Sequence, residues 1–417
     1  MITFRSLAVG VVLSFTSALP AATLTELLNE AAIHNPDIAA ALRGWQASAQ
    51  VPSQVSTLPD PQVSIQHLGV GSPRPFAGYS NSDFAYVGVA VSQDIPYPGK
   101  LSLRGEVAQR DAAMNRAKYE AAKRSVFLQI KESYLQIAYL QKTLSVIQRD
   151  QTLLEQILQI TDSRYRLGQG TQQDVLRVQL QKTKLLNELA QHHELVSRQQ
   201  ALMTKLLNRP SGEPDIQADD LTETPLTYTA EDLLTRVRTQ NPDVSGAQES
   251  VSRQSLQVEL ARKDRYPDFN VQYSWQHTAE QFRDYYMLTF SARLPIYRKK
   301  KLDPEMTQAV EELERSRREY ESRVQQAYFE IRDQYITAET AASTLTIYRE
   351  GLIPQTLATF RAGLSAYQSG TQDFASLLSS FLDVLNFDEE YWKTLADHET
   401  AIVRLEQLTG LTMRQGD

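Results

Sequence analysis

The spacing of apolar residues predicts very long helices in this chain. Leucine and isoleucine recur at the three- and four-residue intervals of a helix with one apolar face, at Leu140, Leu144, Ile147, Leu154 and Leu158. Between about Lys100 and Arg166 there is no proline, and Gly105 is the only glycine. We therefore expect one helix of ~100 Å there, at 1.5 Å per residue. A second long helix is expected at residues 172–207, so that residues 100–207 form a helical hairpin.

Two shorter segments, at about residues 62–70 and 86–95, alternate between polar and apolar positions. In the second segment Val87, Val89 and Val91 share one face and small or polar residues the other. Such alternation indicates strands with one apolar face. Residues 71–85 between them are rich in glycine, proline and serine and predict a loop. Before the strands, residues 23–48 have helical spacing, with Thr25 as the expected N-cap and an interruption at Asn35-Pro36.

The same order of elements recurs about 200 residues later. His34-Asn35-Pro36-Asp37-Ile38 returns as Gln240-Asn241-Pro242-Asp243-Val244. The later copy predicts a helix at 230–262, strands at about 268–277 and 284–294 around a loop at 278–283, and a helical hairpin at 303–408. The first helix of this hairpin is expected to continue past Gly351 and Pro354, and the second to begin at about Thr371. The apolar faces of its strands comprise Phe269, Val271, Tyr273 and Trp275, and Tyr286, Leu288, Phe290 and Ala292. We interpret the chain as two repeats, 23–208 and 230–410, joined by a polar linker at 209–229 and followed by a tail at 411–417.

The first 22 residues have the pattern of a cleaved signal peptide. A basic Arg5 precedes an apolar stretch from Leu7 to Phe15, and small residues follow around Ala18 to Ala22. This stretch is shorter than the roughly 20 residues that a membrane-spanning helix needs. The chain contains no cysteine, which excludes disulfides, thiolate metal sites and a lipoprotein anchor. The net charge of -7 argues against a nucleic-acid partner, because phosphate binding needs a basic surface.

The strand length suggests a membrane. About ten residues suit a tilted transmembrane strand, and the apolar and polar faces suit a wall between lipid and water. Four strands cannot close a barrel, and open edges are not tolerated in lipid. Several copies must then share one barrel. A soluble four-stranded sheet capped by helices is the alternative, although it leaves the length of the helices unexplained.

Taken together, these features resemble the TolC family of outer-membrane efflux channels over the whole length after the signal peptide. The resemblance rests on the twofold repeat, on Asn-Pro-Asp in the first helix of each half, and on prolines at the joints between strands and helices, Pro59, Pro96, Pro267 and Pro295. It also rests on the turns of the two helical hairpins, which contain Gly168, Gly170 and Thr171 in the first half and Gly370 and Thr371 in the second.

The resemblance implies a mixed fold of α-helices and transmembrane β-strands. A homotrimer would share a twelve-stranded outer-membrane barrel, four strands from each chain, above a periplasmic α-helical barrel. The protein would be a passive conduit for small molecules or metal ions, without enzymatic activity or cofactor. Its partners would be outer-membrane lipid, a periplasmic adaptor protein docked at the hairpin turns, and an inner-membrane pump of the RND type. The alternative from another class is a soluble periplasmic coiled-coil adaptor, which detergent dependence would distinguish.

The resemblance also suggests where the periplasmic end closes. In TolC an acidic residue after the first hairpin turn pairs with a basic residue after the second; Asp174 matches the first, but Gln372 occupies the second position. The paired aspartates at the constriction of TolC fall on Ser376 and Ser379, with Asp373 and Asp383 nearby. The segment Asp94–Lys100 resembles the heavy-metal (CusC- or CzcC-like) branch. His192-His193 makes a poor chelate, and no metal site is expected. The basic run Arg298–Lys301 should either contact anionic headgroups or be solvated.

Overall fold

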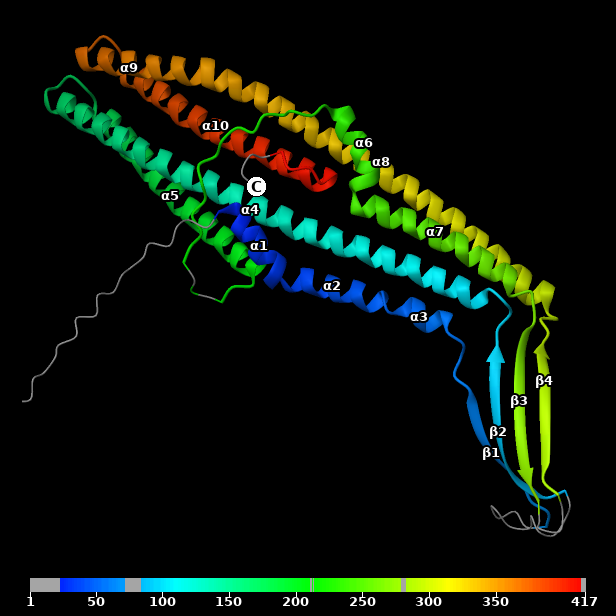
Figure 1. Ribbon diagram of the computed structural model, residues 1–417. Coiled ribbons are helices and arrows are strands. Elements are labelled where there is room, and N and C mark those ends of the chain that lie inside the picture. The colour runs from blue at the N-terminus through cyan, green and yellow to red at the C-terminus, as the bar shows by residue number, and fades with distance from the viewer. Residues whose placement is uncertain (1–22, 72–83, 211, 213, 279–282, 414–417) are drawn as a thin grey trace, which may run out of the picture.

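The computed structural model describes residues 23–71, 84–210, 212, 214–278 and 283–413. The expected signal peptide at 1–22 lies outside these residues, as do most of the loop at 71–85, part of the loop at 278–283 and the end of the tail. The described chain is elongated (Figure 1). A four-stranded sheet forms one end, and the turns of two long helical hairpins form the other.

The first repeat contains, in chain order, α1 (Leu24–His34), α2 (Pro36–Ser48), α3 (Val51–Ser56), β1 (Gln62–Leu68), β2 (Tyr86–Ile95), α4 (Lys100–Arg166) and α5 (Gln172–Leu207). The N-cap of α1 is Thr23 and not Thr25, because the Thr23 hydroxyl accepts the Glu26 N–H in a capping box. The short helix α3 was not expected. Its Pro52 lies in the first turn, where a missing N–H leaves no hydrogen bond unmade.

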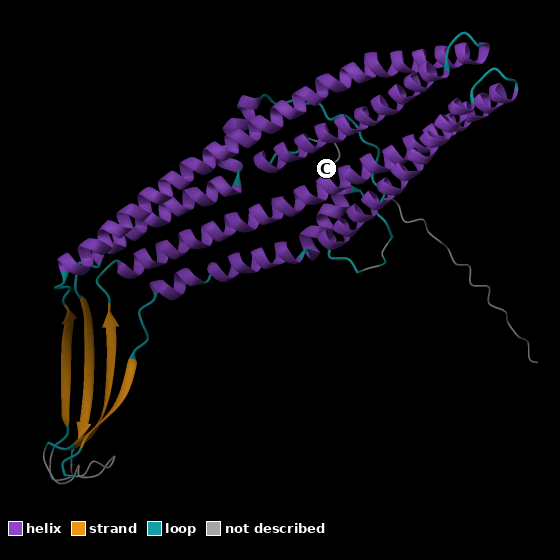
Figure 2. Ribbon diagram, turned by 180° about the vertical axis from the view of Figure 1, so that it is seen from behind, coloured by secondary structure: helices purple, strands orange, loops and turns teal. Residues whose placement is uncertain are grey.

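The second repeat contains α6 (Ala230–Gln240), α7 (Pro242–Lys263), β3 (Asp268–His277), β4 (Tyr285–Arg293), α8 (Asp303–Ile347), α9 (Ile353–Ser369) and α10 (Phe374–Thr409). Two π-helical turns interrupt it, η2 (Arg298–Leu302) before α8 and η3 (Tyr348–Leu352) between α8 and α9. The wider turn η3 accommodates Pro354 in the first turn of α9, so the helix continues past the proline. Figure 2 shows the resulting length of the helices beside the short sheet.

The final helix begins at Phe374, later than the expected start near Thr371. The N–H and hydroxyl of Thr371 both donate to the carbonyl oxygen of Ala366, at 2.9 and 3.1 Å, so this threonine lies in the C-terminal cap of α9. Asp373 is the N-cap of α10 instead, accepting the Ser376 N–H at 2.8 Å. The two hairpin turns are therefore built differently, although their sequences are similar.

The four strands form one antiparallel sheet in the order β1-β2-β3-β4. Its registers place all the predicted apolar residues on a single face, because Val91 lies opposite both Val63 and Tyr273, and Tyr273 lies opposite Leu288. This apolar face is the open one: Ile65 is 75% exposed and Phe290 74%. On the opposite face the small side chains of Ala90 and Ser274 are buried. A sheet with its apolar side outward matches the wall of a membrane barrel.

The repeated asparagine of each half joins three helix ends. The Asn35 side chain accepts the N–H groups of Asp37 and Ile38, at 2.9 and 3.1 Å, and caps α2. Its amide also donates to the Leu206 carbonyl oxygen at the end of α5, at 2.8 Å. In the second half Asn241 makes the equivalent bonds, to the start of α7 and to the carbonyl of Leu408. The Asn-Pro-Asp motif thus fixes a helix bend and anchors it to the hairpin.

The apolar core is distributed along the helices in several clusters. One joins α1, α4 and α5 through Leu27, Ile130 and Met203. The corresponding cluster of the second half joins α6, α8 and α10 through Leu233, Ile331 and Leu405. A third, close to the hairpin turns, contains buried residues of α4, α5, α9 and α10, namely Leu154, Leu185, Phe360 and Phe381. None of the helices in the described part of the chain is apolar over a stretch long enough to cross a membrane.

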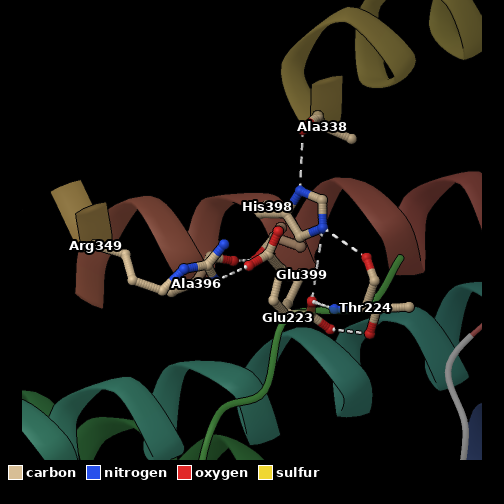
Figure 3. A network of polar contacts seen from close by, with 8 residues as sticks. Glu223, Thr224, Ala338, Arg349, Ala396, His398 and Glu399 are labelled. Atoms are coloured by element: carbon tan, nitrogen blue, oxygen red, sulfur yellow. Dashed lines mark hydrogen bonds and ion pairs between the residues drawn. The ribbon is translucent and has the colours of Figure 1, made fainter. Parts of the chain in front are cut away.

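The linker between the repeats is held against both hairpins. On α5 the Gln200 side chain makes two hydrogen bonds with the backbone of Ile216. On α10 the carboxylate of Glu399 accepts the N–H and the hydroxyl of Thr224, both at 2.7 Å. Figure 3 shows His398 beside this carboxylate, with its ring nitrogens 3.0 Å from the Ala338 carbonyl oxygen and 2.9 Å from that of Thr224. The linker is therefore packed against the bundle.

Candidate functional site

The joint between sheet and helices is built around a buried lysine. The Lys100 side chain begins α4 and is only 3% exposed. Its Nζ lies 2.9 Å from Asp268 Oδ1 and 3.2 Å from Asp264 Oδ1. Asp268 Oδ1 also accepts the Tyr97 N–H at 2.8 Å. A buried ammonium requires such partners, so the joint of the first repeat is locked to the joint of the second.

The residues before Lys100 make this close approach possible. Gly99 has a φ of +84°, and a Cβ there would lie 2.6 Å from the Nζ of Lys263. That Nζ donates to the Pro98 carbonyl oxygen at 3.2 Å. The rings of Tyr97 and Tyr266 stack with centroids 4.5 Å apart. The Pro-Gly-Lys segment, which we read from sequence as a mark of one branch of the family, thus has a structural use here that the sequence did not reveal.

The four predicted joint prolines all lie just outside the strands. Pro59 precedes β1 and Pro267 precedes β3, while Pro96 follows β2 and Pro295 follows β4. Proline lacks the N–H that a sheet ladder uses. These positions therefore limit how far each strand can extend toward the helices.

The first hairpin turn closes on itself. Gly168 has a φ of +71°, which favours glycine, and Gly170 follows before the helix. Thr171 is the N-cap of α5, and its hydroxyl accepts the Asp174 N–H. The Asp174 carboxylate in turn accepts the Thr171 N–H at 3.1 Å. The residue matched to the acidic half of the TolC gate is therefore engaged in a capping box within its own turn.

The second hairpin turn uses different contacts. Gly370 has a φ of +82° and ends α9. Gln372 lies against Gly363, since a Cβ on that glycine would come within 3.4 Å of its amide atoms. Hydrogen bonds from the N–H and hydroxyl of Ser376 hold the pKa of Asp373 below its usual range. Within the described single chain no hydrogen bond or ion pair joins Asp174 to Gln372.

The other predicted gate residues share one face of α10. Ser376, Ser379 and Asp383 are exposed, at spacings of three and four residues, whereas Leu377 and Phe381 are buried behind them. The helix therefore presents a polar stripe away from the core of its own chain. This placement agrees with residues that face a water-filled space, and their role in closure stays a prediction.

One residue that the sequence did not single out connects the two turns. Arg164, near the end of α4, donates to the Tyr367 carbonyl oxygen of α9, and its guanidinium carbon lies 4.6 Å from the centre of the Tyr367 ring. It also donates to the Gln169 carbonyl oxygen at 3.1 Å. Because many charged residues lie on the surface of α4, nothing in the sequence distinguishes Arg164 from them.

A second missed group ties α4 to α10 farther from the turns. The Arg149 guanidinium donates to Asp150 at 2.7 Å and to Asp388 at 2.5 Å. The Asp150 side chain is 2% exposed, and burial raises the pKa of this carboxyl, opposed by the hydrogen bonds from Arg149. A signal for Asp150 did exist in the sequence, because it falls between Ile147 and Leu154 on the apolar stripe of α4.

Both repeats match one protein family. The family model for outer membrane efflux proteins covers residues 27–209 and 233–411, which is most of the chain and includes both sheet–helix joints. The chain belongs to the outer membrane efflux protein family. Members of the family are outer-membrane channels that extend into the periplasm and act as transport conduits rather than enzymes, together with a periplasmic adaptor and an inner-membrane pump. No curated protein is similar enough in sequence to count as a relative.

Solved structures of efflux channels share the fold at low sequence identity. The outer-membrane channel OprN is 16% identical with a TM-score of 0.80, over 93% of this chain and 89% of that one. CusC is 13% identical with a TM-score of 0.79, over 98% of both chains. VceC from Vibrio cholerae is 18% identical with a TM-score of 0.78, over 94% of this chain and 97% of that one. These similarities show the predicted combination of helical hairpins and a four-stranded sheet.

Proposed function

We propose that three copies of this efflux protein form a passive channel of a tripartite pump, with a shared twelve-stranded barrel in the outer membrane. The observation that carries the proposal is the sheet, whose apolar face is open along all four strands while Ala90 and Ser274 are buried on the other face. Four strands cannot close a membrane barrel alone. The long hairpins below the sheet would form the periplasmic tunnel.

The proposal assigns the periplasmic entrance to the hairpin turns. Gly168, Gly170 and Thr171 with Gly370 and Thr371 would present the surface that an adaptor protein contacts. Asp174, Gln372 and the stripe of α10 that contains Ser376, Ser379 and Asp383 would narrow the tunnel. The inner-membrane partner would be a pump of the RND type, which supplies the energy that a conduit lacks.

The cargo would be small molecules or metal ions. A metal cargo is suggested only by the resemblance of Asp94–Lys100 to the heavy-metal branch. Gly99 and Lys100 have a structural role, because they pack against Lys263 and pair with Asp268 at the joint between sheet and helices. This segment therefore supports the predicted fold and does not favour a particular cargo. An export assay in cells that carry the chain with its adaptor and pump, comparing a divalent metal with an organic cation, would assign the cargo class.

The decisive experiment is reconstitution. The mature protein should require detergent, have the mass of a trimer, and conduct ions across a planar bilayer. A protein that purifies without detergent as a monomer, or a detergent-purified trimer without conductance, would overturn the channel.

A further inference from the structure

The two outer strands of the sheet each have an edge without a partner in the described chain. β1 pairs only with β2, and β4 pairs only with β3. In a hydrocarbon environment the backbone groups of such edges must be paired. If the chain forms the shared barrel proposed above, β4 of one copy must pair with β1 of another. The internal repeat determines which residues then lie opposite each other.

The repeat is regular enough to transfer a strand register. Each residue of β1 corresponds to the residue 208 positions later in β3, an offset that also relates Asp60 to Asp268. Residues 86–94 of β2 correspond to the residues 199 positions later in β4, an offset that also relates Pro96 to Pro295. With these offsets the pair Ser64–Ala90 becomes Gln272–Thr289, which is observed. All other pairs between β1 and β2 transfer equally to observed pairs between β3 and β4.

The observed pairing of β2 with β3 can be carried over in the same way. Its equivalent is β4 of one copy against β1 of the next. The pair Ser92–Gln272 becomes Ser291–Ser64, and the pair Val91–Tyr273 becomes Phe290–Ile65. We propose that neighbouring copies of this chain join in this register, with Ser291 opposite Ser64 and Ala292 opposite Val63.

The faces of the two strands agree with this register and exclude a shift by any odd number of residues. It sets Phe290 against Ile65 and Ala292 against Val63, so the apolar face continues without a break from one copy to the next. It also sets Ser291 against Ser64, which continues the polar face. A shift of one residue would turn every side chain of one strand to the wrong face. The offsets come from motifs at the ends of the strands, Pro59-Asp60 with Pro267-Asp268 and Pro96 with Pro295, and not from the faces that they bring together.

The same transfer gives the basic run Arg298–Lys301 a partner. At the joint inside the chain, Lys100 pairs with Asp268. The counterpart of Asp268 is Asp60, which is exposed, and the counterpart of the turn before α4 is the turn that contains the basic run. The four cations of this run form no ion pair within the described residues. In the joined copies, Asp60 of the neighbouring copy forms an ion pair with the basic run Arg298–Lys301, as Asp268 does with Lys100 within one chain.

Disulfide cross-linking tests the register directly, because the chain has no cysteine. Directly opposed residues have Cα atoms about 4.5–5.5 Å apart, within disulfide range, whereas diagonal neighbours are farther apart. The variant Ser64→Cys/Ser291→Cys, oxidised in outer-membrane preparations of the full-length protein, should give a covalent trimer on non-reducing gels. Two matched controls shift the register, Ser64→Cys/Ala292→Cys by one residue and Ser64→Cys/Thr289→Cys by two, and both should yield little product.

The outcomes separate this register from the proposed channel. Stronger cross-linking of a shifted pair would overturn the register and keep the channel. If no pair cross-links, the mass of the protein in mild detergent distinguishes two cases. A trimer would reject the proposed register alone, whereas a monomer would reject both the register and the trimeric channel. For the joint, Asp60→Lys should lower the temperature at which the trimer dissociates, whereas Asp215→Lys on an exposed part of the linker should not. If the Asp60→Lys trimer dissociates at the same temperature as the control, the proposed ion pair between Asp60 and the basic run would be overturned. The basic run would then have another partner, such as anionic lipid.

Discussion

Arg164 at the end of the first hairpin donates a hydrogen bond to the carbonyl oxygen of Tyr367 in the second. Its guanidinium also lies over the Tyr367 ring. Arg164 therefore links the two hairpin turns of each chain, beside the apolar cluster of α4, α5, α9 and α10, at the end that would meet the adaptor. This connection runs within one chain and is additional to any contacts between copies.

Replacing Arg164 with alanine should loosen the contact between the turns and raise the conductance of the channel in planar bilayers. A hydrogen bond to a charged group contributes about 1.5–3 kcal/mol, so open events should become clearly more frequent. Arg166→Ala is the matched control, because that arginine is exposed and, among the residues that the structure describes, forms an ion pair only with Asp162 one helical turn away. Equal conductance of the two variants would show that Arg164 has no part in closure.

For the polar stripe of α10, we predict a change in ion selectivity. If Asp383 faces the tunnel, Asp383→Lys should shift the reversal potential in a salt gradient toward anions, because fixed charge in a pore selects against ions of the same sign. Lys393→Asp, farther along the same helix, is a charge-change control. A reversal potential that stays at the wild-type value would remove Asp383 from the conduction path.

The structure fixes which strand face should tolerate charge. Val89 and Tyr273 lie on the open apolar face, so a lysine at either position should impair assembly by up to about 2–4 kcal/mol, the cost of a cation at the centre of the bilayer. Gln272→Lys, on the opposite face next to Tyr273, should assemble normally. The assembly of each variant is measured as the yield of heat-resistant trimer in outer-membrane fractions. Normal yield with lysine at Val89 or Tyr273 and reduced yield for Gln272→Lys would mean that the two faces are assigned the wrong way round.

Gly88 should be intolerant of any side chain. It lies on the crowded face of β2, where an added Cβ would approach the Trp275 carbonyl oxygen to 2.4 Å and force β2 and β3 apart. We expect Gly88→Ala to abolish the folded trimer. Gly44→Ala is the matched control, since it meets nothing within 4 Å in α2 and should stabilise the helix by about 0.5–1 kcal/mol. Similar melting temperatures for the two variants would contradict the crowding.

Most of the architecture could be predicted from the sequence, because its signals are long and repeated. Helical spacing over dozens of residues in α4, and alternation in β2 and β3, depend only on the local geometry of helix and strand. The expected continuation of the helix past Pro354 is confirmed, and a π-helical turn precedes the proline. The same reasoning failed at the second hairpin turn, where local hydrogen bonds compete. Thr371 lies in the C-terminal cap of α9 rather than at the start of α10, because its N–H and hydroxyl both donate to the Ala366 carbonyl oxygen.

The contacts of the candidate site were less predictable, because they join residues far apart in the sequence. The pairing of Lys100 with Asp268 depends on how two joints meet, which neither motif encodes alone. Asp174 was chosen by resemblance, but its capping role follows from Thr171 three residues before it. Arg164 had no visible signal, since its partners are a carbonyl oxygen and a ring of the other repeat.

The buried Asp150 makes a prediction about pH. Burial raises the pKa of its carboxyl in the folded protein, so the folded state holds this proton more tightly than the unfolded chain. Its contribution to stability is fully present below the unfolded pKa of about 3.9 and is lost as the pH rises through the folded value.

Asp150→Asn removes this dependence of stability on pH. The new amide keeps an oxygen that can accept from Arg149, and Arg149 retains its ion pair with Asp388. The difference in melting temperature between variant and wild type should therefore be largest and in favour of the variant at neutral pH, and should shrink on acidification. Because all other carboxyl groups are common to both proteins, a difference that stays constant between pH 7 and 4 would show that Asp150 is ionised in the fold at no cost.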